Sequence, residues 1–292
     1  MVATIIKAII LGLLTGGVYA LMASGLTLIF GVMEVVNIAQ GILVMLGAYL
    51  SYVVGRFLHL DMFVGLLITM PVMFVIGVGI DWIFVRRIKK ERTALSILVM
   101  YSVALLIEGL LNRIFSANYV QLSAPYIDAS FPVLGFYLPY VYVFLFILSV
   151  VLLTLLYVLV YRTKFGYSLR AAMQNRTAAA LIGIDVERIS MITFGIGVAL
   201  AGAGGMAYGA TNVFNAASSY DLISRLLVII VLGGMGSLSG ALLASLALVT
   251  IGDITAVIWS PTWSSTVFFV LLVFLLLFRP QGLFGQAEGR KQ

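Results

Sequence analysis

The chain contains no cysteine and a single histidine, His59, among its 292 residues. Without cysteine it can form no disulfide, thiolate metal site or thiol nucleophile, and one histidine cannot build a histidine cluster or the catalytic set of an intramembrane protease. No Gly-x-x-x-x-Gly-Lys-Ser/Thr loop occurs either, so the chain does not bind nucleotide phosphates in the P-loop manner. The sequence therefore predicts no enzyme active site, no metal and no cofactor.

Charge is also scarce. Only 10% of the residues are charged, 63% are hydrophobic and the mean hydropathy is +1.17, whereas a soluble domain carries about 25% charged residues. The net charge of +6 does not indicate a nucleic-acid partner, because the basic residues fall in short loops between apolar runs, as the positive-inside pattern requires. These features predict an integral membrane protein that contacts membrane lipid and no nucleic acid.

Long apolar runs are what the sequence has in abundance. The N-terminal run is longer than the about 7–15 residues of a signal peptide's hydrophobic region, so we interpret it as a membrane helix. We predict an all-α polytopic membrane protein with about eight transmembrane segments, forming a single domain over residues 1–292. A window of about 20 residues, enough to span about 30 Å of hydrocarbon, places the segments near 5–30, 38–57, 62–85, 94–115, 137–160, 190–211 and 262–278, with a further apolar stretch at 222–252.

Basic loops predict the orientation. The loop "VRRIKKERT" (85–93) carries five basic residues against one acidic residue, and short basic loops stay in the cytoplasm. Alternation then places the basic segment 162–189 in the cytoplasm and the N-terminus outside. If 222–252 crossed the membrane once, the basic C-terminal tail would lie outside, so we expect an even number of passes there and a cytoplasmic C-terminus.

The stretch 222–252 contains its own break. "LGGMGSLSG" (232–240) places four glycines and two serines in its middle, which is enough to interrupt a helix. We predict a re-entrant or discontinuous helix pair. Irregular backbone at membrane depth is tolerated only where it is buried in protein or lines a water-filled cavity.

A second stretch, "GVMEVVNIAQG" (31–41), has the same layout of apolar arm, glycine, methionine and polar segment. Paired interrupted segments indicate a transport route, and a spacing of three residues predicts that its polar side chains share one helical face. Two alternatives stay open: both stretches are interfacial turns, or Asn37 and Gln40 hold two helices together. The predicted translocation residues are Glu34, Asn37, Gln40, Gly41, Gly233, Gly234, Gly236 and Ser237.

The segment 162–189 is short, basic and rich in alanine, a strong helix former. With Gly166 near its start and Gly183 as a natural stop, we predict a helix outside the bilayer. A membrane-surface amphipathic helix is one alternative. The alanine face buries little in lipid, which favours docking into a protein socket.

Smaller signals predict packing. Four small residues that recur every fourth position predict one close-packing helix face: Gly197, Ala201, Gly205 and Gly209. Among ionisable residues, we expect Glu108 to pack near Arg113, Asp81 to pair with Arg86 or Arg87, and Asp221 to pair with Arg225 four residues on.

The stretches "GLTLIFGVMEVVNIAQGILVMLGAY", "FGYSLRAAMQNRTAAALIGID", "IIVLGGMGSLSGALL" and "FRPQGLFG" together resemble the permease subunits of ATP-binding-cassette importers for branched-chain amino acids, of the LivH type. The resemblance implies a type II importer fold in a bacterial inner membrane, with 162–189 as the segment that couples to an ATPase. It also implies a second homologous permease of the LivM type, two ATPase subunits and an extracytoplasmic substrate-binding protein. The coupling residues it implies are Gly166, Ala171, Ala172, Asn175, Ala178, Ala179 and Gly183.

One position departs from that family. This chain reads Asn37-Ile38-Ala39-Gln40-Gly41 where the family usually reads Asn-Phe-Ala-His-Gly, and glutamine cannot carry charge. Branched-chain amino acids are the implied substrate, while urea, short amides and aromatic acids stay open. Two other classes of function stay open as well: an ion-coupled secondary transporter, for which only Glu34 and Glu108 are candidate intramembrane acids, and a channel for small polar solutes.

Overall fold

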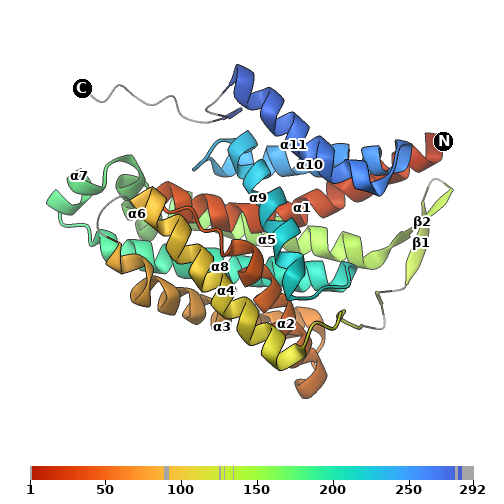
Figure 1. Ribbon diagram of the computed structural model, residues 1–292, viewed down its shortest axis with the longest axis horizontal. Coiled ribbons are helices and arrows are strands. Elements are labelled where there is room, and N and C mark those ends of the chain that lie inside the picture. Colours follow the sequence, from red (N-terminus) through yellow and green to blue (C-terminus); the bar gives the residue numbers. More distant parts are fainter. Residues whose placement is uncertain are drawn as a thin grey trace.

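The computed structural model describes residues 2–88, 92–124, 126–127, 129–133, 135–279 and 282–284. Two short strands, β1 (Ser130–Val133) and β2 (Phe136–Pro139), pair as an antiparallel hairpin. Every other regular element is helical (Figure 1): α1 (Val2–Met33), α2 (Gln40–Leu58), α3 (Met62–Ile83), η1 (Val85–Arg87), α4 (Arg92–Phe115), α5 (Tyr140–Arg162), α6 (Lys164–Gln174), α7 (Arg176–Leu181), α8 (Val186–Thr211), η2 (Ala216–Ser218), α9 (Ser219–Gly233), α10 (Leu238–Ile258) and α11 (Pro261–Phe278).

Within the described residues, nine helical stretches are long and apolar enough to cross a membrane. This confirms the predicted all-α polytopic fold. The number is nine rather than about eight because both arms of 222–252 qualify. The long helices run roughly along the long axis of the molecule, with α6 and α7 at one end and the β1–β2 hairpin at the other (Figure 1). We call these the α7 end and the hairpin end.

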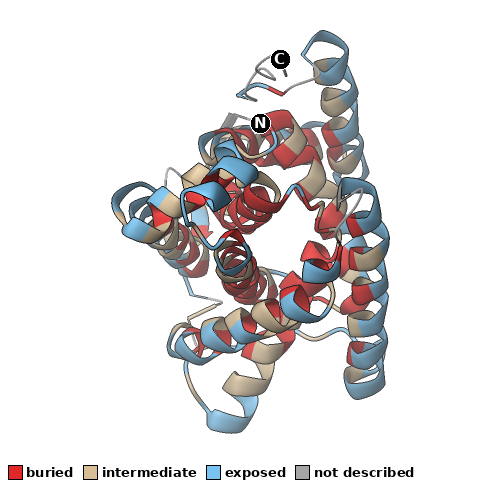
Figure 2. Ribbon diagram, turned by 90° about the vertical axis from the view of Figure 1, so that its left-hand side faces the viewer, coloured by how far each residue is buried: buried red, intermediate tan, exposed pale blue. Residues whose placement is uncertain are grey.

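Helix α8 is the most buried of these stretches and packs against α1, α2 and α3. The predicted small-residue face is present, and it brings backbones into direct contact. A Cβ built on Gly205 would lie 2.0 Å from the Val44 carbonyl oxygen, and one on Gly25 would lie 2.6 Å from the Gly197 carbonyl oxygen. Figure 2 shows the buried residues on the facing sides of the helices, with exposed residues around the outside.

The break predicted in 222–252 is confirmed. Helix α9 ends at Gly233 and α10 begins at Leu238, and the turn between them uses positive φ angles of 95° at Gly234 and 87° at Gly236. Ser237 caps α10 by accepting a hydrogen bond from the Gly240 N–H at 3.1 Å. The two arms form a helical hairpin whose turn lies near the end of α1, since a Cβ on Gly31 would lie 3.4 Å from the Gly236 Cα.

The prediction that Glu34, Asn37 and Gln40 share one helical face is wrong. Helix α1 stops at Met33, Glu34 adopts a left-handed conformation with φ 55°, and residues 34–39 are not helical. The chain folds back along α1, so that the Gln40 Nε2 lies 3.4 Å from the Met22 carbonyl oxygen. At about 1.5 Å per residue, α2 therefore begins about 16 Å inside the end of α1.

The contact between Gly205 and Val44 is open to a direct test. The change Gly205→Ala forces a methyl group into the α2 backbone, so we expect a lower thermal unfolding midpoint and less folded protein after extraction. The matched control is Gly79→Ala in α3, where an added Cβ meets nothing within 4 Å and the better helix propensity of alanine, about 1 kcal/mol, leaves stability unchanged or higher. Equal effects of the two changes would contradict the packing argument.

Candidate translocation and coupling sites

Asn37 and Gln40 form one buried polar pair. Each is 0% exposed, and the Asn37 Nδ2 donates to the Gln40 Oε1 at 3.1 Å. The Gln40 amide in turn reaches the Met22 carbonyl, while the Asn37 Oδ1 has no hydrogen-bond partner among the described residues. Within this chain the pair connects the start of α2 to the middle of α1, which is the helix-holding alternative left open by the sequence.

Residues 34–39 carry non-helical backbone into the protein interior, where both distant and local groups bond to it. The Val36 N–H donates to the Ser96 hydroxyl at 3.2 Å, and the Gln40 N–H donates to the Asn37 carbonyl at 3.2 Å. Glu34, in contrast, is exposed, and its carbonyl accepts from the Thr93 hydroxyl at 3.3 Å. Glu34 thus lies apart from the buried pair with which it was grouped.

The glycines of the two interrupted stretches are contact points between elements. Gly41 lies against the start of α9, because a Cβ there would be 2.4 Å from the Ser219 carbonyl oxygen. Gly233 and Gly240 cross so closely that a Cβ on Gly240 would be 1.9 Å from the Gly233 carbonyl oxygen. The stretches 31–41 and 232–240 also meet in space, because Gly31 lies against Gly236.

Leu283 and Phe284 contact the end of α9. The sequence did not predict this contact. The N–H of Leu283 donates to the Leu232 carbonyl at 2.8 Å, and the N–H of Phe284 donates to the Gly233 carbonyl at 3.3 Å. These are orphan carbonyls at the end of α9. Leu283 and Phe284 thus cap the end of α9.

The predicted coupling segment, residues 162–189, begins with two helices, α6 and α7, rather than the single helix predicted. We call it the coupling segment below for its predicted role. Asn175 breaks it: with φ −157°, its side chain accepts from the Ala178 N–H at 2.9 Å and starts α7. Asparagine is a preferred N-cap, so this signal was present in the sequence. Gly166 lets α6 fold tightly onto α5, since a Cβ there would be 2.2 Å from the Val160 carbonyl oxygen. Gly183, with φ 88°, follows the end of α7 as expected.

The alanines implied as coupling residues divide into two groups. Ala172 and Ala179 are buried within this chain and Ala171 is half-buried, whereas Ala178 is exposed, as are Asn175 and Gly183. The predicted coupling residues do not include the two most exposed apolar side chains of the segment, which are Leu181 at 84% and Ile182 at 76%. They form the tip of α7, directly before Gly183. The sequence contained one signal for this exposed tip: an apolar pair directly before a glycine that ends a helix.

The coupling segment is fixed to the end of α1. The Arg176 Nη1 donates to the Val32 carbonyl at 2.7 Å, which satisfies one of the orphan carbonyls of α1. The Met173 methyl group lies against Gly31, since a Cβ on Gly31 would be 2.6 Å from it. Gly31 also faces Gly236, so α6, α7, α1 and the α9–α10 turn meet at one junction.

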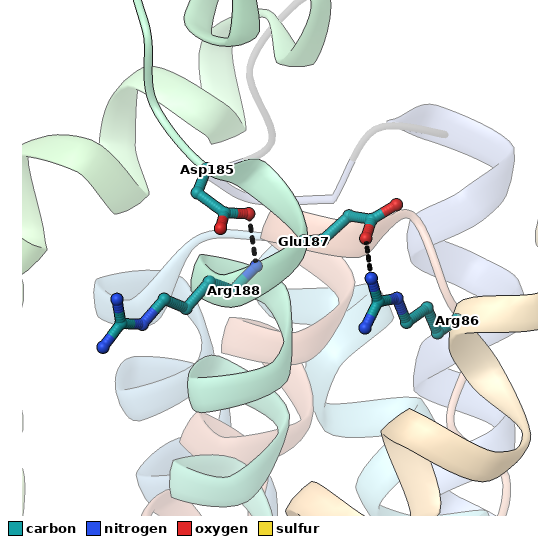
Figure 3. Close-up of polar contacts among 4 residues, drawn as sticks. All are labelled: Arg86, Asp185, Glu187 and Arg188. Atoms are coloured by element: carbon teal, nitrogen blue, oxygen red, sulfur yellow. Dashed lines mark hydrogen bonds and ion pairs between the residues drawn. The ribbon is translucent and has the colours of Figure 1, made fainter.

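A second connection holds the start of α8 (Figure 3). Asp185 caps the helix by accepting from the Arg188 N–H at 3.0 Å. Glu187 forms an ion pair with Arg86 of η1, so Arg86 connects η1 to the start of α8. Both residues of this pair are at least half exposed, and such surface pairs contribute about 0–1 kcal/mol.

The predictions for the other ionisable residues were partly confirmed. The predicted pair of Asp221 and Arg225 is present at 3.0 Å. Glu108 accepts a hydrogen bond from the Tyr220 hydroxyl at 2.5 Å. Asp253 was missed, because the predicted apolar stretch stopped at 252 whereas α10 continues to Ile258.

Together, the nine apolar helices and the segment fixed at one end define a multi-pass membrane protein of the transport class. A family model described as "Branched-chain amino acid transport system / permease component" matches residues 8–276. The chain belongs to this family, as the sequence resemblance indicated, and it is a permease component of a transport system in the inner membrane. This favours transport over an enzymatic function and supports the importer over the ion-coupled transporter or channel.

Named relatives agree. The chain is 28% identical to the high-affinity branched-chain amino acid transport system permease protein BraD of Pseudomonas aeruginosa, over 98% of this chain and 97% of BraD. It is 33% identical to a probable branched-chain amino acid transport permease protein LivH of Methanocaldococcus jannaschii, over 76% and 72% of the two chains. It is also 30% identical to the permease protein LivM of Escherichia coli, over 48% of this chain and 34% of LivM. No solved structure matches the chain.

The buried amide pair yields a prediction in which the double variant is more stable than a single one. Gln40→Leu leaves both polar ends of the Asn37 amide buried without partners, a cost of about 1–3 kcal/mol. Replacing both partners by leucine removes that cost, so we expect Asn37→Leu combined with Gln40→Leu to unfold at a higher temperature than Gln40→Leu alone. Thermal unfolding in detergent measures this. Simple addition of the two single effects would show that the amides act independently.

Proposed function

We propose that the chain is the LivH-type permease subunit of a binding-protein-dependent importer, a single domain over residues 1–292. It would move branched-chain amino acids, or a related small amino acid or amide, into the cell. The relatives named above support this substrate class. The partners would be a LivM-type second permease, two ATPase subunits and an extracytoplasmic binding protein. The observation that carries the proposal is the exposed apolar tip of α7 on a segment fixed to the end of α1.

The charge distribution supports an orientation with the α7 end in the cytoplasm. Basic residues of η1, α5, α6 and α7 lie at this end, and the positive-inside rule keeps such segments cytoplasmic. The N-terminus of α1 is at the opposite, hairpin end (Figure 1). Leu283 and Phe284 bond to the end of α9 at the α7 end, so the C-terminus would be cytoplasmic and the N-terminus outside.

The tip of α7 has the properties of a docking surface. Leu181 and Ile182 lie outside the candidate spans and are largely exposed, so the rest of this chain does not cover them. Burial of one such side chain contributes about 1.5–3 kcal/mol. An ATPase subunit with an apolar groove would cover both and gain affinity.

The junction supports a route by which ATPase movement reaches the membrane helices. A displacement of α7 pulls on the hydrogen bond between Arg176 and the Val32 carbonyl. It also presses Met173 on Gly31, which touches the turn between α9 and α10. Helices α1 and α9–α10, with the predicted pathway residues Gly233, Gly234, Gly236 and Ser237 between them, would then move together and change access to the route.

Ala179 is a poor site for testing this docking. It is buried within the chain, so an added arginine would disrupt the coupling segment itself whether or not an ATPase binds. The exposed tip offers a cleaner change. Asp substitutions at Leu181 and Ile182 leave the interior packing untouched.

We expect Leu181→Asp combined with Ile182→Asp to abolish ATPase association and ATP-driven uptake, with normal amounts of folded permease. Loss of two buried side chains corresponds to an affinity decrease of more than about 100-fold. Co-purification of the ATPase and uptake into proteoliposomes measure the result. The matched control, Tyr137→Asp, changes a side chain that is 67% exposed at the hairpin end and should retain the ATPase. Wild-type ATPase recovery with the double variant would overturn the docking proposal.

Because the chain has no cysteine, single-cysteine variants report topology without background. We expect Tyr137→Cys to react with a membrane-impermeant thiol reagent in intact cells and Thr177→Cys, on exposed α7, to react only after permeabilisation. Reaction of Thr177→Cys in sealed cells would reverse the proposed orientation.

A further inference from the structure

A polar cavity of about 220 Å³ lies among α1, α5, α8, α9 and α10, well away from the junction described above. Its walls include Leu11 from the N-terminal half of α1, Tyr19 from the middle of α1, Tyr208 from the last turn of α8, and Asn212 directly after α8. These parts of α1 and α8 lie toward the hairpin end (Figure 1). We call this space the outer cavity.

The outer cavity contains an arginine and an aspartate that do not pair with each other. Arg225 bonds elsewhere: its Nε lies 3.0 Å from the Asp221 carboxylate, and its Nη2 donates to the Ser265 hydroxyl at 3.1 Å. Asp253 forms no ion pair with any residue in the described part of the chain. Arg225, Asp253, Tyr19 and Tyr208 nevertheless line the same cavity.

Hydrogen-bond capacity indicates what the cavity lacks. Arg225 pairs with Asp221, so the Asp253 carboxylate is left with acceptor capacity that no described side chain uses. Ionisable groups within membrane spans are costly and face partners, cavities or substrates. An ammonium group is a hydrogen-bond donor whose charge suits this carboxylate.

The rest of the wall suits the other parts of an amino acid. The Arg225 guanidinium and the hydroxyl groups of Tyr19 and Tyr208 are donors of the kind that bind a carboxylate. Val18, Leu145 and Val249 add apolar surface. The volume is below the about 300–1,000 Å³ of drug-sized pockets, so the cavity fits a small ligand.

We propose that the outer cavity is a binding site at which a zwitterionic, aliphatic amino acid pauses during transport. Its ammonium group bonds to Asp253, its carboxylate faces Arg225 and the tyrosine hydroxyls, and its side chain lies on the apolar wall. The choice of an amino acid rests on the proposed function, whereas the unused acceptor capacity of Asp253 is a feature of the cavity itself.

The test measures leucine binding to the assembled transporter in lipid nanodiscs, with no binding protein present. We expect measurable binding that Asp253→Asn weakens by about tenfold or more, the size expected for loss of a charged hydrogen bond. Asp253→Glu keeps the charge and should bind leucine more tightly than Asp253→Asn. The matched control Glu108→Gln removes a carboxylate outside the cavity and should bind as the wild type does.

Two leucine analogues distinguish binding from a structural effect. 4-Methylpentanoate lacks the ammonium group and leucinamide lacks the carboxylate, so both should bind the wild type more weakly than leucine. Asp253→Asn should narrow the difference between leucine and 4-methylpentanoate, which a merely structural role would not do. No leucine binding to the wild type, or equal affinities in the wild type and Asp253→Asn, would overturn the inference.

The same preparation separates this inference from the proposed function. If the ATPases co-purify and ATP drives uptake while Asp253→Asn binds leucine normally, the outer-cavity site is wrong and the importer stands. If no ATPase associates, the importer itself is wrong, and leucine binding by the purified chain still tests the cavity.

Discussion

Backbone contact along α8 is the constraint on which the rest of the molecule depends. Lipid provides no hydrophobic force between helices, so association relies on close van der Waals packing. Gly25 against Gly197 and Gly205 against Val44 bring the helix axes together at a distance that only glycine permits. Because α1 and α2 both lie on α8, their relative height is fixed, and α2 must begin beside the middle of α1. The non-helical segment 34–39 is a consequence of that offset.

That segment ends the α1 helix where the coupling segment can reach it. The Val32 carbonyl is left without an intrahelical partner, and Arg176 fills the position. The last carbonyls of α9 also have partners, because they accept hydrogen bonds from the N–H groups of Leu283 and Phe284. Helix ends buried in protein need such partners, and here the partners come from segments that lie outside the spans. The helix ends at the α7 end thus form one mechanically continuous unit.

The sequence predicted those features that depend on local composition. Hydropathy located the spans to within several residues, and the glycines of 232–240 located the helix break. Prediction from the sequence failed where contacts between residues far apart in the chain determine the local conformation. A spacing of three between Asn37 and Gln40 reads as a helix, but the bond from Gln40 to Met22, 18 residues away, and the bond from Val36 to Ser96, 60 residues away, favour an extended path. Asn175 is a preferred N-cap residue, so the sequence indicated the start of α7, but we did not predict it.

The two ends of the molecule use charge in different ways. At the α7 end, Arg176 bonds to the last turn of α1 and Asp185 caps α8, so both charged groups fix structure. In the outer cavity, Arg225 and Asp253 share one polar wall without forming an ion pair. A fully paired carboxylate would have no capacity left for a ligand, and an isolated one would be too costly to keep inside a membrane protein. An arrangement between these limits permits a stable empty cavity and a weak, reversible contact, which is what passage through a permease requires.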